Sequence, residues 1–188
     1  MFSTAKIASA LALSSLASGM ALNHKRAAET GVQLYVYGSG YGTPLTYADG
    51  FAYFGRTSPA DAVVSTNITF TLDNAVVSVP WTIAANSSTV SFTSDLSMYI
   101  IPSNGSFAPV GFSTAADLPT GAVNSGFTFY GRTVSYVTPS SLDYQMNFWA
   151  NATTTPYVYA LYWKSKSATV PSTAFPVVVK STSPTFLI

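Results

Sequence analysis

The strongest constraint on the fold of this chain is a succession of short segments in which every second side chain is apolar. In residues 67–72 (NITFTL), Ile68, Phe70 and Leu72 share one face. Asn67 lies on the opposite face, so the segment has the apolar and polar sides of a half-buried strand. No stretch of helical length repeats its apolar residues with the helical period of about 3.6 residues. The pattern therefore predicts strands and no helix.

Other segments of this kind are rich in Val, Thr and aromatic residues and are separated by the turn formers Gly, Pro, Asn and Ser. The predicted strands are residues 33–37, 50–54, 67–72, 76–83, 89–93, 97–101, 126–130, 144–149, 157–163 and 175–179. In the fourth of them, alternation directs Val79, Trp81 and Ile83 to the interior. So many short strands predict an all-β fold, either a β-sandwich or a closed barrel.

Two stretches of the sequence are near copies of each other. Residues 50–57 (GFAYFGRT) return as residues 126–133 (GFTFYGRT) at an offset of 76 residues. At almost the same offset, residues 74–81 (NAVVSVPW) parallel residues 151–157 (NATTTPY). Two matching blocks at one spacing indicate an internal duplication.

The duplication predicts two pseudosymmetric half-repeats of about 76 residues, 31–106 and 107–182. Each half is near the size at which a lone hydrophobic core becomes marginal. No Gly-, Pro- or Ser-rich linker separates the halves, so one shared domain is favoured over two independent ones.

The first residues have the layout of a secretory signal peptide. Lys6 precedes an uncharged stretch, residues 7–23, that is rich in Ala, Leu and Ser and contains small residues near its end. A transmembrane anchor is disfavoured, because a spanning helix needs about 20 strongly apolar residues. We therefore expect a signal peptide over residues 1–21.

A dibasic pair, Lys25 and Arg26, follows the predicted signal peptide and suits a kexin-type processing protease. The expected products are a short pro-segment, residues 22–26, and a mature chain, residues 27–188. Processing leaves five basic and seven acidic side chains, so the net charge moves from +1 to −2. Such a chain lacks the basic surface that nucleic acids require, and no nucleic-acid partner is expected.

Four asparagines stand in N-x-S/T acceptor sites for N-glycosylation, and together with the signal peptide they indicate the secretory pathway. They are Asn67, Asn86, Asn104 and Asn151. The last residues lack the long apolar tail of a glycolipid-anchor signal. The sequence therefore predicts an extracellular or cell-wall protein without a membrane anchor.

The side chains that most enzymes use for nucleophilic or metal chemistry are nearly missing. The chain has no cysteine, and its one histidine, His24, precedes the dibasic pair. The mature chain therefore cannot build a Ser-His-Asp triad, a Cys-His pair or a histidine-ligated metal site. We expect no cofactor, no metal and no catalytic residues.

Hydrolysis of a glycosidic bond by two carboxylates is the remaining enzymatic alternative. The available acids are Glu29, Asp49, Asp61, Asp73, Asp95, Asp117 and Asp143. None of them forms a recognisable pair, and Asp49-Gly50 and Asp73-Asn74 have the composition of turns.

The candidate ligand-binding residues are aromatic residues on predicted strands and the two arginines of the repeated motif. They are Tyr35, Tyr37, Arg56, Arg132, Tyr157, Tyr159 and Trp163. Exposed aromatic rows suit stacking on sugar rings, although aromatic residues also fill β-sandwich cores. The arginines either contact a ligand at two equivalent places or tie down turn carboxylates such as Asp49 or Asp143.

Several segments of the chain resemble a family of small secreted proteins of filamentous fungi. They are residues 31–40 (GVQLYVYGSG), 47–57 (YADGFAYFGRT), 67–74 (NITFTLDN), 125–133 (SGFTFYGRT), 146–150 (MNFWA) and 159–163 (YALYW). The resemblance implies a fungal extracellular protein and supplies no catalytic residues.

These observations lead to one functional hypothesis and one alternative. The hypothesis is a secreted, N-glycosylated, non-catalytic protein of the extracellular space or cell wall that engages polysaccharide or a host surface. The alternative is a carboxylate-dependent glycoside hydrolase, for which two acids must face each other in a cleft.

Overall fold

The computed structural model describes residues 28–38, 41–138 and 142–185, and this part of the chain is built of strands without any helix. The strands form two antiparallel sheets, so the predicted all-β class is confirmed. The predicted signal peptide, His24 and the dibasic pair Lys25 and Arg26 lie outside the described residues.

The larger sheet contains eleven strands in the described part of the chain. Its main path runs β1-β6-β7-β8-β10-β5-β15-β14-β16, while β4 pairs with β5 and β6, and β9 pairs with β15. The strands are β1 (Glu29–Val32), β4 (Thr46–Ala48), β5 (Phe51–Gly55), β6 (Ser65–Leu72), β7 (Thr82–Ala85), β8 (Leu96–Tyr99), β9 (Phe107–Pro109), β10 (Gly111–Ser113), β14 (Phe148–Ala152), β15 (Val158–Lys164) and β16 (Phe175–Pro176).

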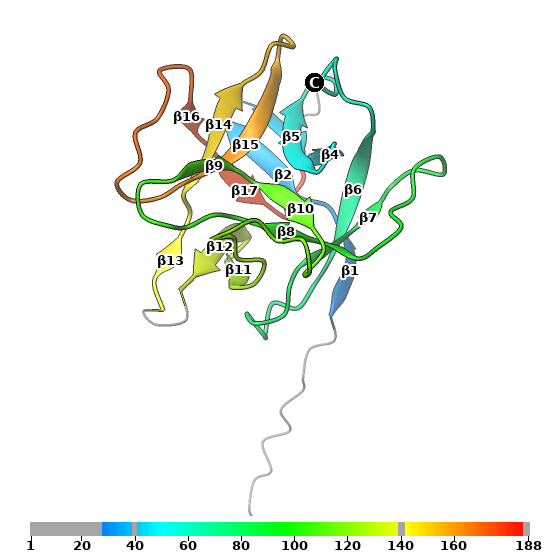
Figure 1. Cartoon of the computed structure of the whole chain (residues 1–188). Helices are drawn as coiled ribbons and strands as arrows, with labels where there is room; N and C mark the ends of the chain where they lie inside the picture. Colours follow the sequence, from blue (N-terminus) through cyan, green and yellow to red (C-terminus); the bar gives the residue numbers. More distant parts are fainter. Residues whose placement is uncertain (1–27, 39–40, 139–141, 186–188) are drawn as a thin grey trace, which may run out of the picture.

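The smaller sheet contains six described strands in the order β11-β12-β17-β2-β3, with β13 paired to β12. The strands are β2 (Tyr35–Gly38), β3 (Tyr41–Pro44), β11 (Phe127–Tyr130), β12 (Thr133–Val137), β13 (Tyr144–Gln145) and β17 (Val178–Lys180). In Figure 1, β11, β12 and β13 gather at the lower left, and β14 and β15 lie at the opposite, upper end. The chain passes from the smaller sheet to the larger one between β13 and β14.

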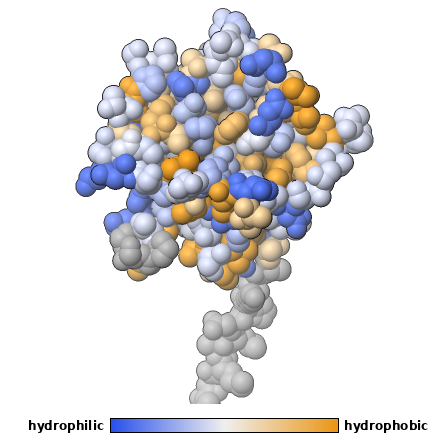
Figure 2. Space-filling model, in the orientation of Figure 1, coloured by the Kyte–Doolittle hydropathy of each residue, from blue (hydrophilic) through white to orange (hydrophobic). Residues whose placement is uncertain are grey.

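One hydrophobic cluster joins the two sheets. Val36 and Phe127 come from the smaller sheet, whereas Phe70, Phe148 and Trp163 come from the larger one, and all are buried. The predicted apolar face of residues 67–72 is confirmed, since its Ile, Phe and Leu side chains are buried. Figure 2 shows apolar and polar side chains side by side on one face of the molecule.

A tight turn joins β4 to β5, as the Asp49-Gly50 pair predicts. Asp49 has a φ of 45° and Gly50 a φ of 88°, the two positive values that a two-residue type I′ hairpin needs. The Asp49 carboxylate accepts hydrogen bonds from the backbone N–H groups of Val63 and Val64, each at 2.8 Å. Asp49 therefore fixes a neighbouring loop.

The segment before β7 differs from the predicted strand 76–83. Residues 77–79 form a turn in which the Val79 N–H donates to the Val76 carbonyl at 3.0 Å. Trp81 and Ile83 are buried as expected, but Val79 is 40% exposed. The turn removes Val79 from the alternation that would have directed it inward. Residues 89–93 also contain no strand.

The two copies of the duplicated motif occupy different sheets. β5 lies inside the larger sheet and pairs with β4, β10 and β15, whereas β11 ends the path of the smaller sheet and pairs with β12. Each copy begins at a glycine with positive φ, 88° at Gly50 and 93° at Gly126. The duplication itself stays a prediction.

Candidate functional site

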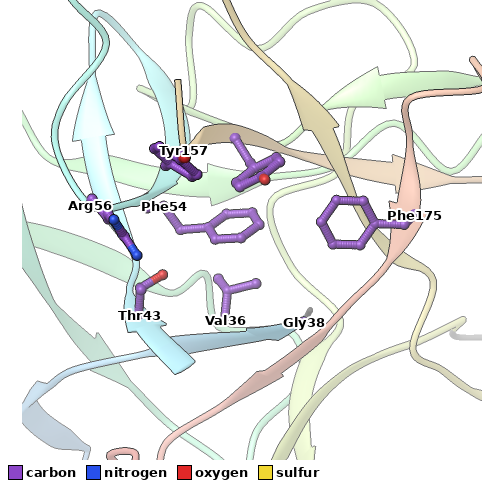
Figure 3. A pocket seen from close by; sticks show the side chains of 9 residues that line it. Val36, Gly38, Thr43, Phe54, Arg56, Tyr157 and Phe175 are labelled. Atoms are coloured by element: carbon purple, nitrogen blue, oxygen red, sulfur yellow. The ribbon is translucent and has the colours of Figure 1, made fainter. Parts of the chain in front are cut away.

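Three of the predicted ligand-binding residues meet in one pocket between the two sheets, here called the intersheet pocket (Figure 3). They are Arg56, Tyr157 and Tyr159. The rest of the lining comes from β2, β3, β5 and β16, and consists of Val36, Gly38, Thr43, Phe54, Gly55 and Phe175. Its volume of about 60 Å³ admits a few water molecules or a methyl-sized group, well below the ~150 Å³ of a cavity that holds benzene.

Aromatic rings hold the intersheet pocket together. The rings of Phe54 and Tyr159 stack with their centroids 5.5 Å apart, and Tyr159 meets Phe175 edge-on at 5.4 Å. Figure 3 shows Phe54 and Phe175 directed toward the same space. The hydroxyl of Thr43 is buried beside them and has no hydrogen-bond partner.

Arg56 and Tyr157 form the outer rim of the intersheet pocket. The Arg56 guanidinium lies over the Tyr157 ring, 4.7 Å from its centroid, a favourable cation–π arrangement. The Arg56 N–H donates to the Tyr157 carbonyl at 3.2 Å. Tyr157 has a φ of 63° and its side chain is 63% exposed, so the pair stands at the surface.

Tyr35 and Tyr37 lie on β2 outside this pocket. Their side chains are half-buried, and the intervening Val36 is buried, as the alternation predicts. The Tyr37 hydroxyl donates to the Thr182 carbonyl at 2.7 Å, and the Lys180 ammonium lies 5.0 Å from its ring centroid. Burial, and secondarily the neighbouring Tyr35, raises the pKa of Tyr37. These contacts indicate that both tyrosines help to fix the sheet.

The other two predicted ligand-binding residues do not join the site. Trp163 is 0% exposed and packs edge-on against Tyr136 and Phe148, so its assignment to ligand binding is corrected to the core. Arg132 is exposed in the two-residue turn between β11 and β12. It lies in the other sheet from Arg56, which follows β5.

A second, larger depression contains none of the predicted ligand-binding residues. We call it the β13–β14 groove, and its volume is about 480 Å³, within the range of small-molecule sites. One side is made by every second residue of a single stretch: Asp143, Gln145, Asn147 and Trp149. The other side is made by Lys164, Ser165 and Lys166 at the end of β15 and in the following turn.

Backbone pairing between β14 and β15 holds the two sides of the groove together. The Lys164 N–H donates to the Asn147 carbonyl at 2.9 Å. The Lys164 ammonium lies 5.8 Å from the Trp149 ring centroid, and it is 3.4 Å from the Ser165 carbonyl that accepts its hydrogen bond. The groove thus combines an indole ring, two carboxamides, charges of both signs and a hydroxyl.

The Ser165 side chain is the most unusual part of the groove. It is only 4% exposed, and its hydroxyl has no hydrogen-bond partner. A buried hydroxyl without a partner costs about 1–3 kcal/mol. The sequence did contain a signal for the groove, because polar residues at 143, 145 and 147 and Trp149 follow the two-residue period of one strand face.

The carboxylates that the hydrolase alternative requires are mostly engaged in turns. Asp73 accepts from the N–H groups of Ala75 and Val76, and Asp117 accepts from the Thr114 hydroxyl at 2.6 Å. The intersheet pocket has no acid in its lining, and the β13–β14 groove has Asp143. Among the described residues, no three of Asp, Glu, His or Cys cluster as a metal site would need.

The four acceptor asparagines differ in their surroundings. Asn67, Asn86 and Asn104 are exposed, whereas Asn151 is half-buried within β14. The Asn104 side-chain oxygen accepts from the Ser167 hydroxyl, and that of Asn151 from the Thr173 hydroxyl at 3.4 Å. In both hydrogen bonds the acceptor is the amide oxygen. The amide nitrogen, to which a glycan would be attached, takes no part in them.

Comparison with known proteins leaves the family of the chain open, because no family model, curated protein or solved structure matches it. Over residues 28–38, 41–138 and 142–185, no helix has the length and hydropathy needed to cross a membrane.

Proposed function

We propose that this chain is a secreted, N-glycosylated, non-catalytic protein of the extracellular space or cell wall that binds polysaccharide in the β13–β14 groove. The observation that carries the proposal is the composition of this groove. An indole ring beside paired carboxamides offers a sugar a flat apolar surface together with hydrogen-bond donors and acceptors for its hydroxyl groups.

The dimensions of the two depressions support the groove over the intersheet pocket as the place of binding. The groove, at about 480 Å³, has room for a sugar unit, whereas the intersheet pocket, at about 60 Å³, does not accept a ring. The secreted location rests on the predicted signal peptide and on the acceptor asparagines, three of which are exposed.

The experiment is a pull-down of the full secreted protein on a panel of insoluble wall polysaccharides. We expect retention on at least one of them, and a Trp149→Ala substitution is expected to weaken it about tenfold, since stacking contributes on the order of 1 kcal/mol beyond buried area. Phe51→Ala is the matched control, because Phe51 is 36% exposed and outside the groove lining. Absence of retention on every polysaccharide contradicts the proposal.

The same preparation tests the secretory route and the absence of catalysis. We expect the secreted chain to begin at residue 27 and to lose mass on enzymatic removal of N-glycans. Release of reducing sugar from a bound polysaccharide, abolished by Asp143→Asn, would instead favour the glycoside hydrolase alternative.

A further inference from the structure

The basic residues of the chain are few and unevenly distributed over the described surface. Outside the predicted signal peptide and pro-segment there are five: Arg56, Arg132, Lys164, Lys166 and Lys180. Two of these five line the β13–β14 groove, whereas only one of the seven acidic residues, Asp143, does so. The groove lining therefore has a formal charge of +1, whereas the expected mature chain has a net charge of −2.

The two lysines are placed differently, and both positions suit contact with an anion. Lys164 is half-buried beside Trp149, and one of its three N–H donors points to the Ser165 carbonyl. Partial burial reduces the screening of its charge by solvent. Lys166 is exposed in the turn after β15, where it widens the positive side of the groove.

From this arrangement we infer that the groove selects acidic polysaccharide, a sugar chain bearing carboxylates, over neutral polysaccharide. The sugar ring lies against Trp149 and its carboxylate contacts Lys164 and Lys166. This inference rests on the proposed function and specifies its ligand.

Asp143 also lines the groove, and its carboxylate opposes an anion placed close to it. A carboxylate ligand is therefore expected on the side of the two lysines, with neutral hydroxyl groups toward Asp143, Gln145 and Asn147.

The test compares binding of the full-length protein to polygalacturonate and to the same polymer after methyl esterification, which removes the charge and keeps the sugar. We expect the esterified polymer to bind about tenfold more weakly and added salt to weaken binding of the acidic polymer alone. Lys166→Gln is expected to reduce affinity for polygalacturonate about fivefold. Lys166 is exposed, so this substitution leaves the fold intact.

Lys180→Gln is the matched control, because Lys180 lies over Tyr37 in the smaller sheet and outside the groove. Equal binding of the two polymers, unaffected by Lys166→Gln, overturns the inference and leaves the proposed function standing. Failure to bind either polymer or any neutral polysaccharide overturns both. Equal losses in Lys166→Gln and Lys180→Gln mean a general charge effect and also overturn the inference.

Discussion

Gly55, at the rim of the intersheet pocket, is the glycine at which an added side chain would come closest to backbone atoms. A Cβ at this position would lie 2.2 Å from the Tyr157 carbonyl oxygen and 3.0 Å from the Val158 Cα, and its φ of 143° is strained for other residues. Both neighbours are backbone atoms, so neither can rotate away. We expect Gly55→Ala to lower the free energy of unfolding by about 3 kcal/mol, measured by urea denaturation.

Gly131→Ala provides the comparison for this prediction. Gly131 also has a positive φ, 65°, but nothing lies within 4 Å of its added Cβ. Gly131→Ala should lower the free energy of unfolding only by the backbone strain of a left-handed residue, about 1–2 kcal/mol. Equal losses in the two variants would show that β5 and Tyr157 do not approach as closely as described.

The burial of individual aromatic residues could not be predicted from their positions in the alternating pattern. Trp149 and Trp163 lie on paired strands and both follow the alternating pattern, yet Trp149 lines the groove and Trp163 is fully buried. The difference arises because β14 and β15 pair Phe148 with Trp163 and Trp149 with Tyr162, so the two tryptophans lie on opposite faces of the sheet. Sequence periodicity separates the two faces of a strand and does not tell which face the rest of the chain covers.

At the scale of elements, one side chain attaches the β11–β12 hairpin to the loop that follows β6. The Asn74 amide oxygen accepts hydrogen bonds from the Phe129 N–H at 2.7 Å and from the Thr128 hydroxyl at 2.8 Å. Asn74→Ala leaves both donors without this partner. We expect a loss of about 2 kcal/mol in the free energy of unfolding and faster amide hydrogen exchange at Phe129.

Asn74→Asp separates the lost hydrogen bonds from other effects of the substitution. A carboxylate keeps an acceptor oxygen in the same place, so stability and exchange at Phe129 should stay close to those of the unchanged protein. If the Ala and Asp variants lose equal stability, the acceptor role assigned to Asn74 is wrong.

Long alternating strands could be predicted from the sequence, and short ones could not. β5, β6, β11 and β15 all fall within or around predicted strands. β4, β9 and β10 have three residues each and fall outside every predicted strand, because three residues are too few to display a period. The turn at residues 77–79 was missed because Val is a strand former and the turn lacks the Gly or Asn that would indicate it.

At the scale of the whole molecule, one core spans both sheets without a disulfide, since the chain has no cysteine. The sequence predicted this all-β class, because class depends only on the dominant period of the apolar residues. It did not predict which strands pair across long distances, such as β17 with β2. The β13–β14 groove is lined by residues next to and within the neighbouring strands β14 and β15. The alternating pattern indicates one of its strand faces and does not fix the register that places the two lysines beside that face.

We expect the protein to lose stability at alkaline pH, because folding raises the pKa of several tyrosines. Burial is the largest cause that raises the pKa of Tyr37, Tyr53, Tyr99 and Tyr136. Below about pH 10 these phenols are protonated in both the folded and the unfolded chain, and they add no pH dependence. Above it, the unfolded chain releases protons that the folded chain retains, so the free energy of unfolding falls as the pH rises.

The measurement is a series of urea denaturation curves from pH 8 to pH 11, with phenolate absorbance followed in the folded and the urea-unfolded protein. We expect a steady midpoint at the lower pH values and a decline once the pH exceeds about 10. Tyr99→Phe should make that decline shallower, because burial alone raises the pKa of Tyr99 and phenylalanine fills the same site without an ionisable hydroxyl. Superimposable phenolate curves for the folded and unfolded chains would contradict the burial of these rings.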